Sequence, residues 1–248
     1  MWGVHAIPEF KTRHDCGEYK YKQEIVPKTH LCVPLTFTLE ELISIDQSGL
    51  QTTMSFDRLF SSTSLIYRAI ENDEEDKAFL RRIRMDDLTG YTQSSNQLLR
   101  PMSLNDASKM VESMSKSFLA VMICIPPEPT SGSQEPEPIG SLEISAFPNT
   151  RQHRVCTLEF SFAVAHQGKG YGTEAMNWAV DWAFRVAGMH SVRLICFSFN
   201  ERAARLYERL GFVREGVSRE VYFYDGKWHD HILFSMLERE WAALRAVQ

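Results

Sequence analysis

The sequence has no apolar run long enough to cross a membrane, and its first residues lack a signal-peptide pattern. It has only five cysteines, an odd number, with no Cys-x-x-Cys spacing. This argues against a disulfide framework and favours reduced thiols, and Cys124, Cys156 and Cys196 fall in strand patterns that predict burial. We therefore expect a soluble intracellular protein of the cytoplasm, with the nucleus as an alternative.

An excess of positive charge is also absent, because the 248 residues carry a formal net charge of −5. This balance argues against nucleic acid as the main partner and mildly favours a cationic amine. With 44% hydrophobic residues, the chain can bury one sizeable core or two small ones. We expect an extension of unknown role over residues 1–60, one domain over 61–241 and a tail over 242–248.

The sequence has no Cys/His motif with typical zinc-finger spacing, but one group of residues is a candidate. His14, Cys16, His30 and Cys32 could in principle supply four zinc ligands. The surrounding sequence has no compact zinc-finger pattern, so an irregular arm is the favoured interpretation and we predict no metal. A short helix over residues 39–45 is the one element expected in this extension.

A glycine-rich turn over residues 166–175 is the most informative feature that is present. Three closely spaced glycines allow backbone amides to approach an anion, and the helix pattern that follows adds the positive end of its dipole. The spacing differs from the dinucleotide motif, because the third residue after Gly170 is Thr173, and from a Walker-type loop, because Lys169 is followed by Gly170. We predict a pyrophosphate site.

A second motif spans residues 200–212. Asn200 is a plausible N-cap, Leu206 and Leu210 share one helical face, and Gly211 is a suitable residue to end the helix. The pattern predicts a short helix that begins after the asparagine.

The two motifs together resemble the two signatures of the GNAT superfamily of N-acyltransferases. The first reads Gln167-x-x-Gly170-x-Gly172, and the second reads Asn-x-x-Ala-x-x-x-Tyr-Glu-x-x-Gly-Phe over residues 200–212. The C-terminal sequence, including Asp-Gly-Lys-Trp-His-Asp over residues 225–230, is similar to the sequences of the branch that contains ribosomal-protein alanine N-acetyltransferases. The resemblance covers roughly residues 62–241. It implies a mixed α/β fold of α+β type, with a twisted, mostly antiparallel central sheet flanked by helices, whereas pattern alone favours only α/β or α+β.

The periodicities predict helices after residues 72–73 and over 105–114, 173–187 and 200–210. Strands are expected over residues 65–70, 118–125, 139–147, 155–165 and 191–197, and the Pro-rich residues 126–138 are expected to form a surface loop. A hairpin is expected around Asp225-Gly226, with four side chains facing inward: Val221, Phe223, Ile232 and Phe234.

The resemblance implies that Glu159 acts as a general base for the acceptor amine and that Tyr207 acts as a general acid or as a hydrogen-bond donor to the thiol. Strand alternation puts Glu159 on the face that also carries Ser161 and Ala163. A strand glutamate can instead be merely solvated or paired, and a helix tyrosine can be part of the core. His166 is an alternative base.

The cofactor implied is acetyl-CoA, as cosubstrate. Backbone amides near Ala163 and Val164 would stabilise the oxyanion, and the amides from Gly168 to Thr173 would hold the pyrophosphate. Asn200 would bind the pantetheine arm or serve only as a helix cap. Lys169 would add charge or be merely solvated. The cofactor-binding residues implied are Ala163, Val164, Gln167, Gly168, Lys169, Gly170, Gly172, Thr173 and Asn200.

The function implied is N-acetyl transfer to a primary amine, either of a small molecule or of a protein N-terminus. The alternatives are an acyl-CoA-binding regulatory module without turnover and a structural protein that binds no ligand. Acceptor choice is expected to lie in residues 89–103 and 222–230. The nearby Asp86, Asp87 and Asp225 either attract a cationic acceptor or are ordinary solvated charges. A homodimer is an expectation from the family.

Overall fold

The computed structural model describes residues 56–86, 100–127, 135–147 and 151–246. All of them belong to the compact unit Met54–Gln248. The short helix expected over residues 39–45 and the four candidate zinc ligands lie outside the described residues, as do Asp87 and most of the 89–103 loop.

A seven-stranded sheet with the order β1-β2-β3-β4-β5-β7-β6 forms the centre of this unit. Neighbouring strands are antiparallel except for the parallel pair β4 and β5, so the mixed, mostly antiparallel fold class is confirmed. The strands are β1 (Ile66–Ala69), β2 (Leu119–Ile125), β3 (Glu137–Ala146), β4 (Val155–Phe162), β5 (Ser191–Phe197), β6 (Val213–Tyr224) and β7 (Lys227–Leu237). The helices are α1 (Phe56–Leu59), α2 (Glu74–Asp86), α4 (Leu104–Met114), α5 (Tyr171–Asp181), α6 (Glu201–Arg209) and α7 (Glu238–Ala246), with a π-helical turn at Trp182–Val186.

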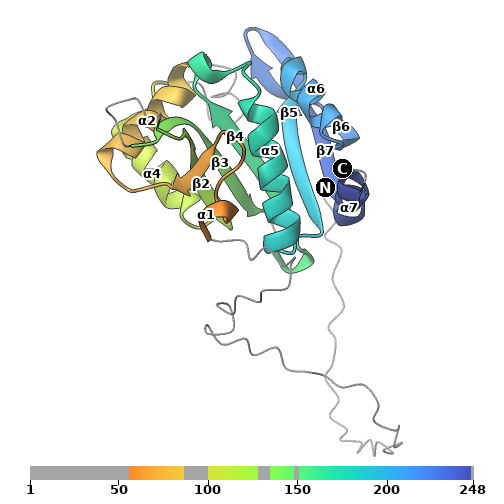
Figure 1. The fold of residues 1–248 in the computed structure, drawn as a ribbon. Coiled ribbons are helices and arrows are strands. Elements are labelled where there is room, and N and C mark those ends of the chain that lie inside the picture. The colour runs from red at the N-terminus through yellow and green to blue at the C-terminus, as the bar shows by residue number, and fades with distance from the viewer. Residues whose placement is uncertain (1–55, 87–99, 128–134, 148–150, 247–248) are drawn as a thin grey trace, which may run out of the picture. The chain divides into compact units, whose positions relative to one another are not determined.

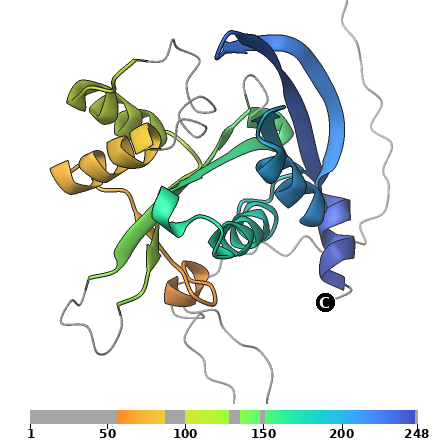
Figure 2. The ribbon, with the colours of Figure 1, turned by 90° about the horizontal axis from the view of Figure 1, so that it is seen from above.

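Helices cover both faces of the sheet (Figures 1 and 2). Alternation along β2 illustrates this arrangement: Met122 and Cys124 pack with α2 and α4, whereas Val121 and Ile123 belong to the larger core that includes α5 and α6. Residues of both clusters are almost fully buried. The sheet is therefore the middle layer between two helical layers.

The strands β4 and β5 part at the centre of the sheet. Their described pairing runs from Val155↔Ser191 to Thr157↔Arg193, although β4 continues to Phe162 and β5 to Phe197. Figure 1 shows α5 in front of the sheet where the two strands separate. Beyond Thr157, one backbone edge of β4 is therefore left without β5 as a partner.

Local capping explains where several helices begin. Asp73 accepts a hydrogen bond from the Asp76 amide at 2.8 Å, as expected for the start of α2. The α4 helix begins one residue earlier than predicted because Ser103 and Asp106 form a reciprocal capping box. Asn200 caps α6 through the Ala203 amide at 3.1 Å, which confirms the predicted cap.

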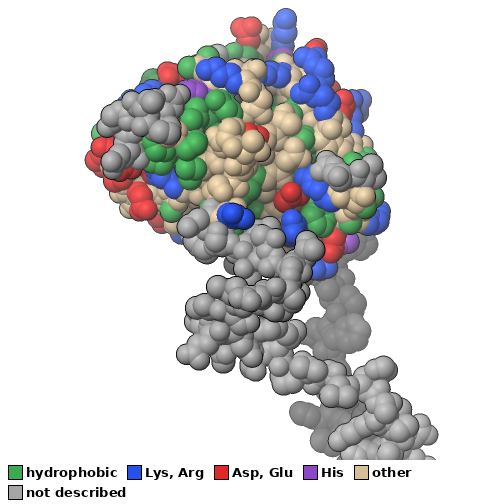
Figure 3. All heavy atoms as spheres, viewed as in Figure 1, with side chains coloured by type: hydrophobic (Ala, Val, Ile, Leu, Met, Phe, Trp, Pro, Cys, Tyr) green, Lys and Arg blue, Asp and Glu red, His purple; other side chains and the backbone are tan. Residues whose placement is uncertain are grey.

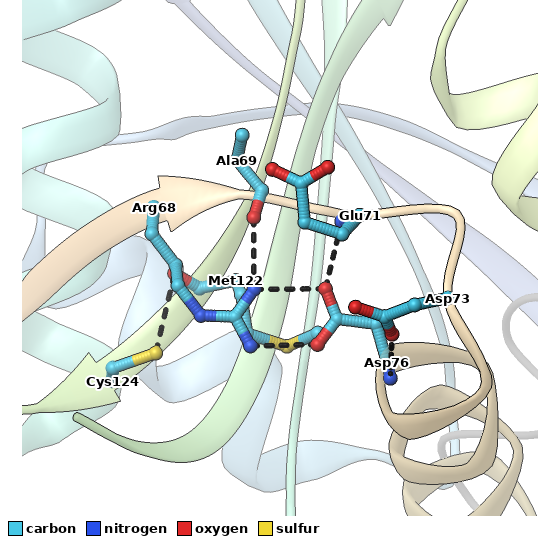
Figure 4. A network of polar contacts seen from close by, with 7 residues as sticks. All are labelled: Arg68, Ala69, Glu71, Asp73, Asp76, Met122 and Cys124. Atoms are coloured by element: carbon cyan, nitrogen blue, oxygen red, sulfur yellow. Dashed lines mark hydrogen bonds and ion pairs between the residues drawn. The ribbon is translucent and has the colours of Figure 1, made fainter. Parts of the chain in front are cut away.

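A partly buried ion pair, between the half-buried Arg68 and the buried Asp76, ties β1 to α2 (Figure 4). Two Arg68 nitrogens donate to the carboxylate of Asp76 at 2.8 and 2.6 Å, and the Glu71 amide donates to the same carboxylate at 2.7 Å. Burial opposes ionisation of Asp76, but the hydrogen bonds from Arg68 and Glu71 outweigh it and lower the Asp76 pKa. The carboxylate therefore stays charged inside the protein.

The strand predicted over residues 155–165 ends earlier than expected. β4 stops at Phe162, and Val164–His166 form a 3₁₀ turn in which the His166 amide donates to Ala163 at 2.9 Å and the Gln167 amide to Val164 at 3.2 Å. Local i→i+3 hydrogen bonds thus replace strand pairing before the glycine turn.

The hairpin turn is confirmed, but the predicted inward direction of two β6 side chains is wrong. Asp225 and Gly226 have φ of 49° and 72°, as a two-residue hairpin turn requires. Ile232 is buried, as predicted, whereas Val221 and Phe223 are 46% and 59% exposed. The register between β6 and β7 shifts between Ser218 and Tyr222, and such a bulge redirects the side chains that follow it. Phe234 is buried, as predicted.

Residues 242–246, predicted as part of a tail, belong to α7. Trp241 of this helix stacks on Phe184 with ring centroids 5.4 Å apart, and its indole donates to Asp181 at 2.7 Å. The predicted burial of Cys124, Cys156 and Cys196 is confirmed. Within the described ranges, none of the helices is both long and apolar enough to span a bilayer.

Candidate active site

The glycine turn begins α5 in the way that the sequence predicts. Gly168 and Gly170 have φ of 80° and 93°, a left-handed conformation that side chains other than glycine rarely adopt. Gly170 is the N-cap of α5, and its carbonyl already accepts from the amides of Thr173 and Glu174. The turn is exposed, so the positive end of the helix dipole faces solvent.

A groove of about 1290 Å³ runs between this turn and α6. Seven of the predicted site residues line it: Gln167, Gly168, Gly170, Gly172, Thr173, Asn200 and Tyr207. Three predicted cofactor-binding residues, although described, are not among its lining residues: Ala163, Val164 and Lys169. The groove also receives Phe160, Ser161 and Phe162 from the end of β4.

Two polar side chains fix the walls of this groove relative to each other. Gln167 donates through Nε2 to the Phe162 carbonyl at 3.2 Å and accepts through Oε1 from Arg202 at 3.4 Å. These contacts join the end of β4, the turn and α6. Asn200 caps α6 while lining the groove, so capping and a contact with the pantetheine arm are compatible.

The Ala163 amide is not available as the expected oxyanion donor, because it already donates a hydrogen bond to the Ile139 carbonyl of β3 at 2.8 Å. Backbone groups alternate in direction along an antiparallel ladder. The amides of Phe160 and Phe162 therefore point to the opposite edge, where β5 has already parted from β4. This edge, rather than Ala163, offers backbone donors next to the groove.

A second, smaller cavity of about 50 Å³ adjoins the groove. The two cavities share Phe160, Ser161 and Tyr207 in their linings. Glu159 lines the smaller cavity, so the structure brings the two predicted catalytic residues to one place. The remaining lining residues are Arg84, Met114, Ser141, Glu143, Leu158 and Ile195.

Glu159 is exposed by the surface area of the whole residue, although many protein atoms surround its carboxylate beside the small cavity. This burial of the charged group, together with the neighbouring Glu143, raises the Glu159 pKa, while Arg84 opposes the rise. A raised pKa makes a carboxylate a better proton acceptor near neutral pH. His166 lines the large groove instead, with Nε2 3.4 Å from a Glu137 oxygen.

Tyr207 is 5% exposed and packs in an aromatic cluster. Its ring centroid lies 6.3 Å from that of Phe160, 6.1 Å from Phe212 and 5.5 Å from Phe234. Burial raises the Tyr207 pKa, and Cys196 and Glu159 add to the effect. The phenol therefore keeps its proton at neutral pH. The ring belongs to the core, and the residue also lines both cavities, so the structure is compatible with either suggested role.

Three arginines of α6 line the groove and were not singled out by the sequence reasoning: Arg202, Arg205 and Arg209. Their spacing of three and four residues puts them on one helical face, which is the signal that could have identified them. Figure 3 shows blue Lys and Arg side chains gathered over the part of the molecule where Figure 1 labels α6. Guanidinium groups here suit the phosphates of a ligand.

Residues 65–213, more than half of the chain, match the family model described as "Acetyltransferase (GNAT) domain". The chain therefore belongs to the GNAT acetyltransferase family.

The curated relatives are similar over shorter stretches. The spermidine N(1)-acetyltransferase of Vibrio cholerae is 36% identical over 78 residues, 32% of this chain and 45% of that protein. The [ribosomal protein uS5]-alanine N-acetyltransferase of Escherichia coli is 33% identical over 86 residues, 35% of this chain and 44% of that protein. The chain thus spans under half the length of these curated relatives.

Among solved structures, spermidine N-acetyltransferase from Vibrio cholerae in complex with CoA and spermine superposes with a TM-score of 0.58 at 22% sequence identity. The match covers 72% of this chain and 98% of that chain. At this identity the likeness shows the fold.

Proposed function

We propose that this protein transfers an acetyl group from acetyl-CoA to a primary amine by direct attack of the amine on the thioester. The observation that carries the proposal is the position of Tyr207, which lines both the groove beside the phosphate-binding turn and the small cavity that holds Glu159. Family membership and the two acetyltransferase relatives support it.

The groove suits the cosubstrate on three counts. The exposed start of α5, with its two left-handed glycines, presents backbone amides and the helix dipole to a pyrophosphate. On the facing wall α6 supplies three arginines and two glutamates, Glu201 and Glu208, so this wall keeps a net positive charge although Arg205 is paired with Glu201 at 2.9 Å. The unpaired edge of β4 offers hydrogen bonds to an extended arm, in the manner of an added strand.

The acceptor amine, with a pKa of about 10, is mostly protonated at neutral pH and must lose a proton before it attacks. Glu159 accepts that proton. When bound, acetyl-CoA supplies the acetyl group as an activated thioester; the new C–N bond forms as the C–S bond breaks. Tyr207 provides the hydroxyl that donates a proton or a hydrogen bond to the departing sulfur. The amides of Phe160 and Phe162 stabilise the negative charge that develops on the carbonyl oxygen.

The acceptor is a small amine or a protein N-terminus; the relatives' names give spermidine and an alanine of a ribosomal protein. A binding module without turnover is the less favoured function, because it would not need Glu159 and Tyr207 around the same cavity. The test is free-thiol release from acetyl-CoA against a panel of polyamines and N-terminal peptides, comparing the wild type with Glu159→Gln.

We expect acceptor-dependent thiol release in the wild type and a fall of about 100-fold or more in Glu159→Gln, the contribution typical of a general base. Glu112→Gln, on the exposed face of α4, is the matched control and keeps wild-type rates. Thermal stabilisation by coenzyme A without thiol release against any acceptor would contradict the proposal and favour the binding module.

A further inference from the structure

We propose that Glu143 is an acceptor-binding residue, whose carboxylate binds the acceptor ammonium beside Glu159 and directs it toward the border with the large groove. This inference rests on the proposed acetyl transfer to an amine. Glu143 carries no sequence motif, and its place is visible only in the folded sheet.

The two glutamates lie directly opposite each other. In the β3–β4 register Glu143 pairs with Glu159, so their side chains project from the same face of the sheet. Residues in this relation have Cβ atoms about 4.5–5.5 Å apart, and like charges in such a pair destabilise a sheet. Both side chains line the small cavity next to Tyr207. Sheet stability therefore does not account for the pair.

Glu143 is held in place from outside the sheet. The Ser117 hydroxyl, in the turn after α4, donates a short hydrogen bond to Glu143 Oε1. A carboxylate has about four acceptor positions on its two oxygens, so this bond leaves capacity for N–H donors of a ligand. A fixed carboxylate loses less entropy on binding than a mobile one.

The charges around the cavity favour a cation. Glu159 lies on β4. Three other groups around the cavity can carry charge: Glu143 on β3, Arg84 on α2 and Tyr207 on α6, whose phenol is un-ionised. The lining contributions of α4 and β5 are the uncharged Met114 and Ile195, and Ser141 and Ser161 are neutral. Two carboxylates against one guanidinium leave a net charge of −1. A volume of about 50 Å³ suits a primary ammonium head group.

The experiment measures steady-state kinetics of the full-length protein with its best acceptor, in the wild type, Glu143→Gln and Glu143→Asp. Each variant yields the KM of the acceptor, the KM of acetyl-CoA, kcat and the pH profile of kcat/KM. The matched control is Glu215→Gln, because Glu215 is also a strand glutamate that accepts from a serine hydroxyl, Ser235, but lies outside both cavities.

We expect Glu143→Gln to raise the acceptor KM about tenfold or more, because it removes a charge-assisted hydrogen bond to the acceptor. The KM of acetyl-CoA should stay unchanged. Loss of the neighbouring negative charge also lowers the proton affinity of Glu159, so the acidic limb of kcat/KM moves to lower pH. Glu143→Asp, which keeps the charge, recovers much of the affinity. Glu215→Gln behaves as the wild type.

Three outcomes would overturn the inference. If the acceptor KM and the acidic limb stay unchanged in Glu143→Gln, Glu143 has no such role, while the proposed function stands. If both KM values rise equally, or the thermal midpoint falls, the residue is structural. If the wild type releases no thiol with any acceptor, both the inference and the proposed function fail.

Discussion

Replacing Tyr207 by phenylalanine removes one oxygen atom and keeps the ring. The ring contacts with Phe160, Phe212 and Phe234 remain, so the aromatic cluster survives. A single hydrogen-bonding group contributes a net free energy of about 1 kcal/mol or less to folding. We therefore expect the free energy of unfolding of Tyr207→Phe to stay within about 1 kcal/mol of the wild type.

The effect of the same change on catalysis is much larger. A positioned acid contributes about 10²–10⁴ in rate. The lower end applies here, because a thiol with a pKa of about 8.5 leaves more readily than an amine or alcohol. We expect kcat to fall about 100-fold, which corresponds to about 2.7 kcal/mol of activation free energy. The KM of acetyl-CoA should change little, because the glycine turn and the α6 arginines are untouched.

The assay is the initial rate of thiol release at saturating acetyl-CoA, with the thermal midpoint measured with and without coenzyme A. Tyr67→Phe is the control, since Tyr67 is another buried tyrosine, 2% exposed and stacked on Trp178, that does not line either cavity. Tyr67→Phe should lower the free energy of unfolding, because it removes the hydrogen bond with Ser62, and should leave kcat unchanged. A kcat within about threefold of the wild type in a stable Tyr207→Phe would refute the acid role.

Three further predictions follow from the fold. Asp76→Ala leaves the Arg68 guanidinium without its buried partner and should lower the free energy of unfolding, measured by urea titration, by about 3 kcal/mol. Glu74→Ala, which removes an exposed ion pair, should have no measurable effect. Equal values for the two variants would contradict the structural role of the network. Because the Asp76 pKa is lowered in the folded state, its stabilisation is present above the unfolded pKa of about 3.9 and is lost as the pH falls through the folded pKa, so Asp76→Asn should show a weaker acid dependence of unfolding than the wild type. Gly170→Ala should raise the KM of acetyl-CoA severalfold. No atom lies within 4 Å of the new Cβ, but a side chain at φ 93° costs about 1–2 kcal/mol and favours a changed turn. An unchanged KM in a folded variant would show that the turn does not hold the pyrophosphate.

Short-range interactions made much of the fold predictable. Asp73 and Asn200 cap their helices, and Asp225-Gly226 turns the hairpin, because each of these interactions involves residues a few positions apart. The glycine turn belongs to the same class, since its left-handed backbone is a property of the glycines themselves. The glycine turn and the start of α6, which both line the groove, were therefore predictable from the sequence.

Long-range pairing decided what could not be predicted. The β6 faces depend on a bulge opposite β7, the Ala163 amide is taken up by β3, and β4 ends where a 3₁₀ turn replaces a strand partner. The Ala163 amide meets its partner Ile139 only when β3 and β4 pair, and a shift of one residue in register, even within a hairpin such as β6–β7, reverses the faces of a strand. Sequence periodicity cannot specify such a shift.

The sequence by itself determined the order of elements from β1 to the β6–β7 hairpin, the caps of α2 and α6, the left-handed glycine turn and the candidate pair Glu159 and Tyr207. Only the tertiary structure decided that these two residues line one cavity, that β4 and β5 part beside it, and that Glu143 faces Glu159 across the sheet. The physical reason is that caps and turns satisfy backbone groups locally, whereas the small cavity is lined by residues from six elements that meet only when the sheet and its helices pack.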